Sequence, residues 1–147
     1  MGQRSGKTVR PFAVASLTAL MLGASGAASG HEGASGIVLE RMEAMTVMAK
    51  SVKTIKAALG NDAGAVRQAA QAIEQRAGVH MTALFPEGEH DGMSEAKPVI
   101  WTEWPEFTAS AVALADAARS LAAEQTPAAF KALVSACGGC HAKFRAE

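Results

Sequence analysis

Apolar residues recur at intervals of three and four through most of the chain after position 36, which is the spacing of amphipathic helices. The pattern predicts helices over residues 37–59, 63–81, 98–123 and 127–144. No stretch alternates strictly between apolar and polar positions, so we expect no strand. Four amphipathic helices with short connections predict an all-α fold, an antiparallel four-helix bundle.

Residues with known helix-end preferences support these boundaries. Gly60 is a stop signal for the first helix, and Asp62 is a suitable N-cap for the second. Thr126 is expected to cap the fourth helix, and Pro105 to kink the third or delay its regular start. A polar stretch with two glycines, residues 87–97, is predicted to be the loop between the two halves of the bundle.

Each predicted helix has an apolar face that should point into the core. The expected faces are Val38, Met42, Met45, Ala49, Val52, Ile55 and Leu59; Val66, Ala70, Ile73 and Ala77; Trp104, Phe107, Ala111, Leu114, Ala118 and Leu121; and Phe130, Leu133, Cys137, His141 and Phe144.

The first thirty residues have the pattern of a secretory signal peptide. Arg4, Lys7 and Arg10 precede an apolar run over 12–22, and small residues follow over 23–30. The run is shorter than the roughly 20 residues that cross a bilayer, so a cleaved signal is expected rather than a membrane anchor. Residues 1–30 are therefore interpreted as a signal peptide, and residues 31–147 as one exported, periplasmic domain.

The charge balance narrows the class of partner. The sequence has 14 basic and 14 acidic residues, and residues 1–30 contain three of the basic residues and none of the acidic ones. Residues 31–147 therefore hold 11 basic and 14 acidic residues, a net charge of −3. This balance argues against nucleic-acid binding, which requires a basic surface. The mature chain has no second long apolar run, so no membrane span is expected there.

The sequence Cys137-Gly138-Gly139-Cys140-His141 carries the candidate chemistry. C-x-x-C-H is the attachment pattern of c-type haem, in which two thiols form thioethers and the adjacent imidazole binds the iron. The two cysteines are the only ones in the chain. Cys137 and His141 share a helix face, so one covalent haem c should lie against the inner side of the last helix.

Other interpretations of the motif are weaker. A structural zinc site needs four ligands, and His31, His80 and His90 are not accompanied by a second cysteine pair. A thioredoxin-like site expects a βαβ unit, which the pattern lacks. A disulfide would leave His141 without a role.

Several segments, in order, make the chain resemble the cytochrome c′ family, the class II c-type cytochromes. In that family the haem motif lies near the C-terminus of a four-helix bundle. The similar segments are Glu40 to Met45, which resembles an R-x-x-x-M/L element; Leu84-Phe85-Pro86; Lys97 to Trp101 with Glu106-Phe107; and Cys137 to Arg145, which fits C-x-x-C-H-x-x-F-R.

The resemblance implies roles for residues outside the motif. Met45 corresponds to the position that faces the iron opposite His141. Arg41 resembles an arginine beside a haem propionate, and Arg145 resembles one beside the proximal histidine. Each arginine lies four residues from its neighbour in the site, so each pair shares a helix face.

Two functions follow from the resemblance, depending on Met45. A Met45–iron bond gives a low-spin, six-coordinate haem suited to carrying electrons between redox proteins, as in the methionine-ligated branch of the family. Without that bond, a five-coordinate haem binds NO or CO at an open site. Met42 and Met48 are expected to pack in the core. An enzyme would need a distal acid–base group, which the first helix does not offer. Family members often form homodimers, so a homodimer is a further expectation.

Overall fold

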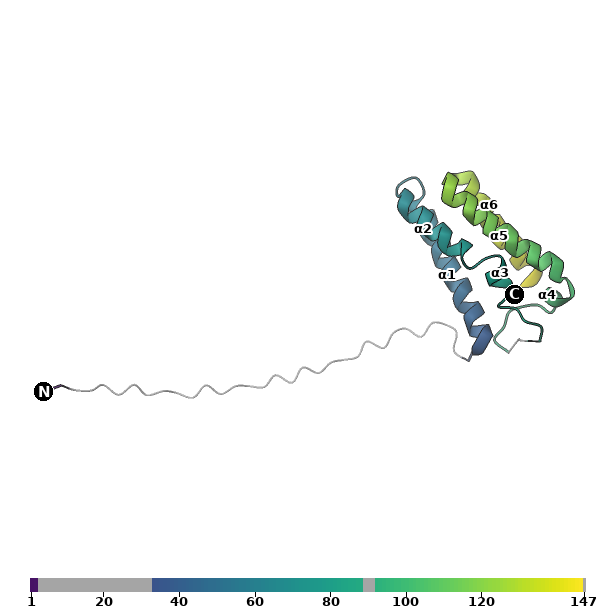
Figure 1. The fold of residues 1–147 in the computed structure, drawn as a ribbon, viewed down its shortest axis with the longest axis horizontal. Coiled ribbons are helices and arrows are strands. Elements are labelled where there is room, and N and C mark those ends of the chain that lie inside the picture. Colours follow the sequence, from purple (N-terminus) through teal and green to yellow (C-terminus); the bar gives the residue numbers. More distant parts are fainter. Residues whose placement is uncertain (3–32, 89–91, 147) are drawn as a thin grey trace.

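Figure 1 shows the helical bundle in the computed structural model, which describes residues 1–2, 33–88 and 92–146. Within these residues the long helices are α1 (Gly36–Ala58), α2 (Ala63–Glu74), α5 (Trp104–Glu124) and α6 (Pro127–Phe144). Two one-turn helices, α3 (Val79–Thr82) and α4 (Val99–Thr102), lie between α2 and α5. Residues 3–30 of the predicted signal peptide lie outside the described residues, so that assignment remains a prediction.

The four long helices form the predicted antiparallel bundle. Helix α1 packs on α2, α2 on α5, α5 on α6, and α6 again on α1. Gly60 adopts φ 86° in the turn after α1, and the Asp62 side chain accepts a hydrogen bond from the Ala65 amide at 2.9 Å. Thr126 caps α6 in the same way, through the Ala129 amide at 3.1 Å. These predicted helix ends are confirmed.

The second predicted helix is shorter than expected. It was placed over residues 63–81, but α2 ends at Glu74 and a separate turn, α3, follows. Gly78 lies between them with φ 58°, and its amide donates to the carbonyl of Ala111 in α5 at 3.0 Å. The backbone after α2 therefore departs from helical geometry, and Gly78 forms a hydrogen bond with α5. The predicted buried residues Val66, Ala70 and Ile73 of α2 are confirmed, and Ala77, which follows the helix, is buried as well.

The third predicted helix is interrupted where Pro105 indicated. Glu103 has φ −118° and ψ 39°, which ends α4, and α5 then begins at Trp104 with proline in its first turn. Proline has no N–H to donate to the carbonyl four residues earlier and is tolerated in the first turn of a helix, so the break precedes Pro105. The expected core residues of α5 from Phe107 to Leu121 are buried.

The inward face of α1 differs from the prediction. The buried residues are Val38, Arg41, Met48, Ser51 and Ile55, whereas Ala49 is exposed. The helix presents two faces to the interior: Met48 and Ile55 join the main core, and the face that carries Met45 lines a cavity. Apolar residues on both faces made the periodicity ambiguous.

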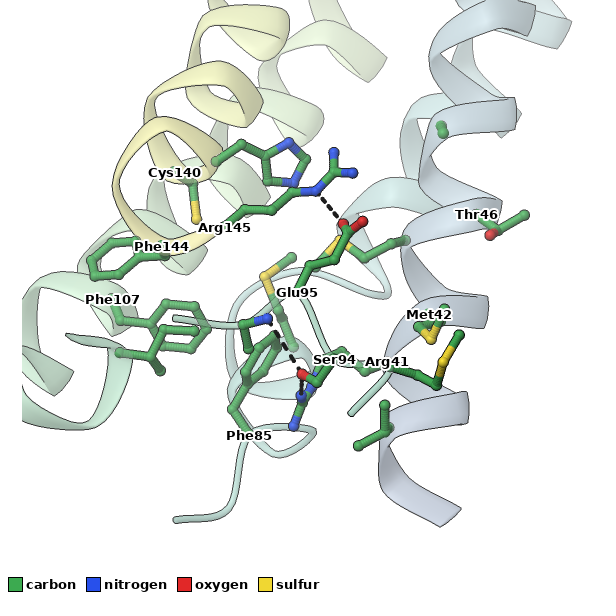
Figure 2. Close-up of a pocket in the computed structure, with 18 residues that line it drawn as sticks. Arg41, Met42, Thr46, Phe85, Ser94, Glu95, Phe107, Cys140, Phe144 and Arg145 are labelled. Carbon is green, nitrogen blue, oxygen red and sulfur yellow. Dashed lines mark hydrogen bonds and ion pairs between the residues drawn. The ribbon is translucent and has the colours of Figure 1, made fainter. Parts of the chain in front are cut away.

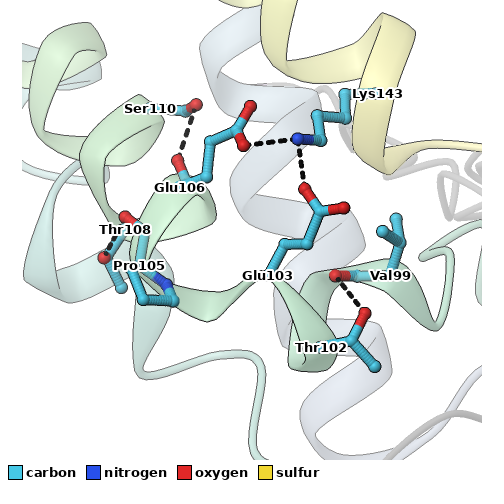
Figure 3. A network of polar contacts seen from close by, with 8 residues as sticks. All are labelled: Val99, Thr102, Glu103, Pro105, Glu106, Thr108, Ser110 and Lys143. Carbon is cyan, nitrogen blue, oxygen red and sulfur yellow. Dashed lines mark hydrogen bonds and ion pairs between the residues drawn. The ribbon is translucent and has the colours of Figure 1, made fainter.

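The core runs the length of the bundle and includes fully buried Ile55, Ile73, Leu121 and Leu133. Ion pairs fasten the end of α6 to the start of α5, because Lys143 contacts both Glu103 and Glu106 (Figure 3). Among the described residues, no helix combines the length and apolar character needed to cross a membrane.

Candidate haem site

A cavity of about 430 Å³ lies between α1 and the C-terminal part of α6 (Figure 2). Helix α1 contributes one wall, α6 the facing wall, and residues 93–96 part of the rim. The lining is largely apolar. The cavity volume lies within the ~300–1,000 Å³ typical of small-molecule and cofactor sites. Such a position, between facing helices of a bundle, is where these folds place cofactors.

The α6 wall contains most of the motif. Cys140 and His141 line the cavity together with Phe144 and Arg145. Cys137 is half-buried one turn earlier and packs against the core, but it does not line the cavity. Both cysteines are free thiols, so they do not form the disulfide considered as an alternative.

Burial favours the neutral forms of the titratable side chains on this wall. It raises the pKa of both cysteine thiols, so neither thiol is activated as a thiolate. Partial desolvation, together with the positive charge of Arg145, lowers the pKa of His141, and Glu95 opposes this effect. A lowered pKa keeps the imidazole neutral, which is the form that binds a metal.

The α1 wall places the candidate distal residues opposite the motif. Arg41, Met42, Met45 and Thr46 all line the cavity. Met45 is half-buried and also packs against the core, whereas Met48 lies in the core with 6% exposure and does not line the cavity. The structure thus brings Met45 and His141 to one cavity from facing helices.

Arg41 is the most buried charged side chain of the site, with 5% exposure. Its Nε and Nη2 donate to the carbonyl of Leu84 at 3.0 and 2.8 Å, and Nη1 donates to Ser94 Oγ at 2.9 Å. The guanidinium also lies 4.0 Å from the centre of the Phe85 ring. Arg41 therefore ties α1 to the connection between α3 and α4. Its contact with a haem propionate stays a prediction.

Arg145 lies at the cavity rim beside His141. Its Nε donates to a carboxylate oxygen of Glu95, and both side chains line the cavity. Sequence reasoning did not single out Glu95, because one carboxylate in a polar loop carries no periodic signal. Its partner, Arg145, is 50 residues away in the sequence, so the pairing could not be predicted from neighbouring residues.

Aromatic rings close the end of the cavity. Phe107 has 2% exposure and contacts Phe85, Trp104 and Phe144 with ring centres 4.8, 5.4 and 5.3 Å apart. Trp101 donates its indole N–H to the carbonyls of Phe85 and Pro86. Both tryptophans are half-buried, which fits a packing role.

The residues present fit a haem. The cavity is apolar, an imidazole and a thioether sulfur face it from opposite helices, and these are established axial ligands of haem iron. The described residues contain no cluster of three or more His, Cys, Asp or Glu side chains suited to a metal ion, so nothing in them supports the zinc interpretation.

Comparisons with known proteins identify the family of the chain. The family model described as Cytochrome C′ matches residues 36–145. Cytochrome c′ of Pararhodospirillum photometricum is 34% identical over 115 residues, which cover 71% of this chain and 92% of that protein.

Solved structures of the same family share the fold. Cytochrome c′ from Rhodopseudomonas palustris superposes with a TM-score of 0.68 at 26% identity, covering 78% of this chain and 98% of that one. Cytochrome c′ from Thermochromatium tepidum gives a TM-score of 0.59 at 30% identity, with 76% and 95% covered. The chain belongs to the cytochrome c′ family, whose members bind haem c covalently.

Proposed function

We propose that this protein carries single electrons in the periplasm, with one haem c attached through Cys137 and Cys140 and bound at the iron by His141 and Met45. The observation that carries the proposal is that His141 and Met45 line the same apolar cavity from facing helices. Haem c, when bound, supplies a one-electron iron couple.

The chain's own residues suit this task. The lowered pKa of His141 keeps its imidazole available as a ligand at neutral pH. The buried rings of Phe85, Phe107 and Phe144 exclude water from the end of the cavity. Histidine–methionine ligation favours the reduced state, and a dry surrounding limits rearrangement between the two oxidation states.

Met45 is the preferred methionine on this wall for two reasons. Met48 belongs to the main core and does not reach the cavity. Met42 lines the cavity but, unlike Met45, does not pack against the core, so Met45 is the better held of the two. A ligand on a supported side chain loses less conformational freedom when it binds.

A second candidate function leaves the position opposite His141 open for NO or CO. The wall of α1 is mostly apolar there, with Val38, Met42 and Ala49 beside Met45, and such a wall suits a neutral diatomic gas. A solved cytochrome c′, 28% identical to this chain, is described as having ligand-controlled dimer dissociation. A homodimer whose assembly responds to a ligand is the corresponding expectation here.

Catalysis is not part of the proposal. Among the described residues that line the cavity, Glu95 is the one carboxylate, and it pairs with Arg145 beside His141 rather than opposite it. A haem enzyme such as a peroxidase needs an acid–base group on the distal side.

An optical spectrum of the haem-loaded protein, oxidised, reduced and then exposed to CO, tests the choice. Low-spin bands that resist CO support Met45 as a ligand, and Met45→Ala should then become high-spin and bind CO. Met42→Ala is the matched control and should keep the low-spin spectrum. High-spin bands in the unaltered protein, shifting readily with CO, would establish the gas-binding alternative instead.

A further inference from the structure

Residues 94–97 form a segment that connects α1 to the end of α6 across the rim of the cavity. Ser94 accepts a hydrogen bond from Arg41 in α1. On the other side, the Lys97 amide donates to the carbonyl of Phe144 at 2.9 Å, and the Ala146 amide donates to the carbonyl of Glu95 at 2.7 Å. Ala96 and Arg145 form an antiparallel bridge.

This short ladder determines where the backbone of Glu95 lies. Its two hydrogen bonds involve main-chain atoms only, so they do not depend on the Glu95 side chain. In an antiparallel pair, residues beside a bridge lie close across the two strands. The ladder therefore brings the Glu95 carboxylate to Arg145, whose position in the sequence is 50 residues away.

The Glu95 carboxylate and the Arg145 guanidinium act together on His141. Figure 2 shows both charged groups meeting at the rim of the cavity. The charge of Arg145 lowers the pKa of His141 and that of Glu95 raises it, so the two effects oppose each other. The hydrogen bond from Arg145 is also the main reason that the pKa of Glu95 is lowered.

We propose that Glu95 is a positioning residue for the proximal side of the haem: held beside His141 by its pairing with Arg145, its carboxylate offsets the guanidinium charge and thereby lowers the reduction potential. This inference rests on the proposed function, because it requires His141 to bind the iron. A lone guanidinium at this place would favour the reduced, less positive centre. The paired carboxylate reduces that effect.

The Glu95–Arg145 ion pair should affect the reduction potential more than the stability of the fold. The side chains of Arg145 and Glu95 are 53% and 59% exposed, and exposed ion pairs contribute little to stability. The ladder at residues 94–97 consists of main-chain hydrogen bonds, so it should form without the pair. Replacing Glu95 should therefore change the potential while the melting temperature stays near that of the unaltered protein.

The test measures the reduction potential of the haem-loaded full-length protein by spectroelectrochemical titration. The variants are Glu95→Gln, Arg145→Gln and the double variant, and Glu124→Gln at the far end of α5 is the matched control. Glu95→Gln should raise the equilibrium constant for reduction about two- to fivefold, the range of an exposed charge pair. For one electron this corresponds to about 20–40 mV.

The double variant separates positioning from simple charge removal. Without Arg145 the exposed carboxylate is no longer held beside His141, so Glu95→Gln should shift the potential at most half as much in the Arg145→Gln background. Equal shifts in both backgrounds would overturn the positioning role, and so would a Glu95→Gln shift no larger than that of Glu124→Gln. A change in melting temperature without a change in potential would show a structural role only.

The same samples distinguish failure of this inference from failure of the proposed function. The covalent haem is measured first, as haem that stays with the chain after denaturation. An unaltered protein without covalent haem would overturn the proposed function and this inference with it. Covalent haem with an unchanged potential in Glu95→Gln would overturn this inference alone.

Discussion

Replacing Arg41 by methionine should destabilise the protein by about 1.5–4 kcal/mol, because this guanidinium holds the connection between α3 and α4 against α1. Methionine keeps an apolar stem of similar length and removes every donor. The Leu84 carbonyl, which accepts from both Nε and Nη2, would lose its charged partner.

The magnitude comes from the contacts that are lost. A part-buried carbonyl left without a donor costs about 1–3 kcal/mol. The guanidinium 4.0 Å above the Phe85 ring adds about 0.5–1 kcal/mol. The Ser94 hydroxyl can turn to water, so its loss adds little. Ser94→Ala should cost less than Arg41→Met, because it leaves both hydrogen bonds from Arg41 to the Leu84 carbonyl in place.

Urea unfolding of the haem-loaded protein measures the difference. With a slope of about 1–3 kcal/mol per M, a loss of about 3 kcal/mol lowers the midpoint by about 1–3 M. Arg67→Met, at an exposed site on α2, is the matched control and should stay within about 0.5 kcal/mol of the unaltered protein. An Arg41→Met variant as stable as this control would refute the reasoning.

Two further predictions concern the cysteines and the acid range. Cys137→Ser and Cys140→Ser should each weaken covalent haem retention, measured by haem staining after denaturing electrophoresis; full retention in both variants would contradict the attachment. Lys143 holds the pKa of Glu106 below 4.5, so the stabilisation from this pair is complete above pH 4.5 and is lost as the pH falls through the lowered value. Glu106→Gln should flatten the fall of the urea midpoint between about pH 5 and pH 3, and an unchanged slope would count against the pair.

The helix patterns predicted most of the bundle and the interruption near Pro105, but not the early end of α2. The buried stripe of α5 and the caps at Asp62 and Thr126 follow from residues close together in sequence. The end of α2 before Gly78 does not, because its cause is a hydrogen bond to Ala111 in another helix. The inward face of α1 was predicted only in part, because its apolar residues contact both the core and the cavity.

In the candidate site, too, some features could be predicted from the sequence and others only from the structure. The C-x-x-C-H motif and the family resemblance predicted which residues take part, and the structure brings Arg41, Met45, Cys140, His141 and Arg145 to one cavity. The contacts of Arg41 with Leu84 and Ser94 had no sequence signal, because both partners lie in an irregular connection. The pairing of Glu95 with Arg145 had no sequence signal either.

The sequence by itself determined the helices, the all-α class and the haem-attachment motif, because spacing along a helix and the C-x-x-C-H pattern are local properties of the chain. Tertiary structure alone decided where α2 stops, which face of α1 meets the cavity, and which carboxylate meets Arg145. These depend on backbone hydrogen bonds and side-chain contacts between distant segments, which form only when the helices pack against one another.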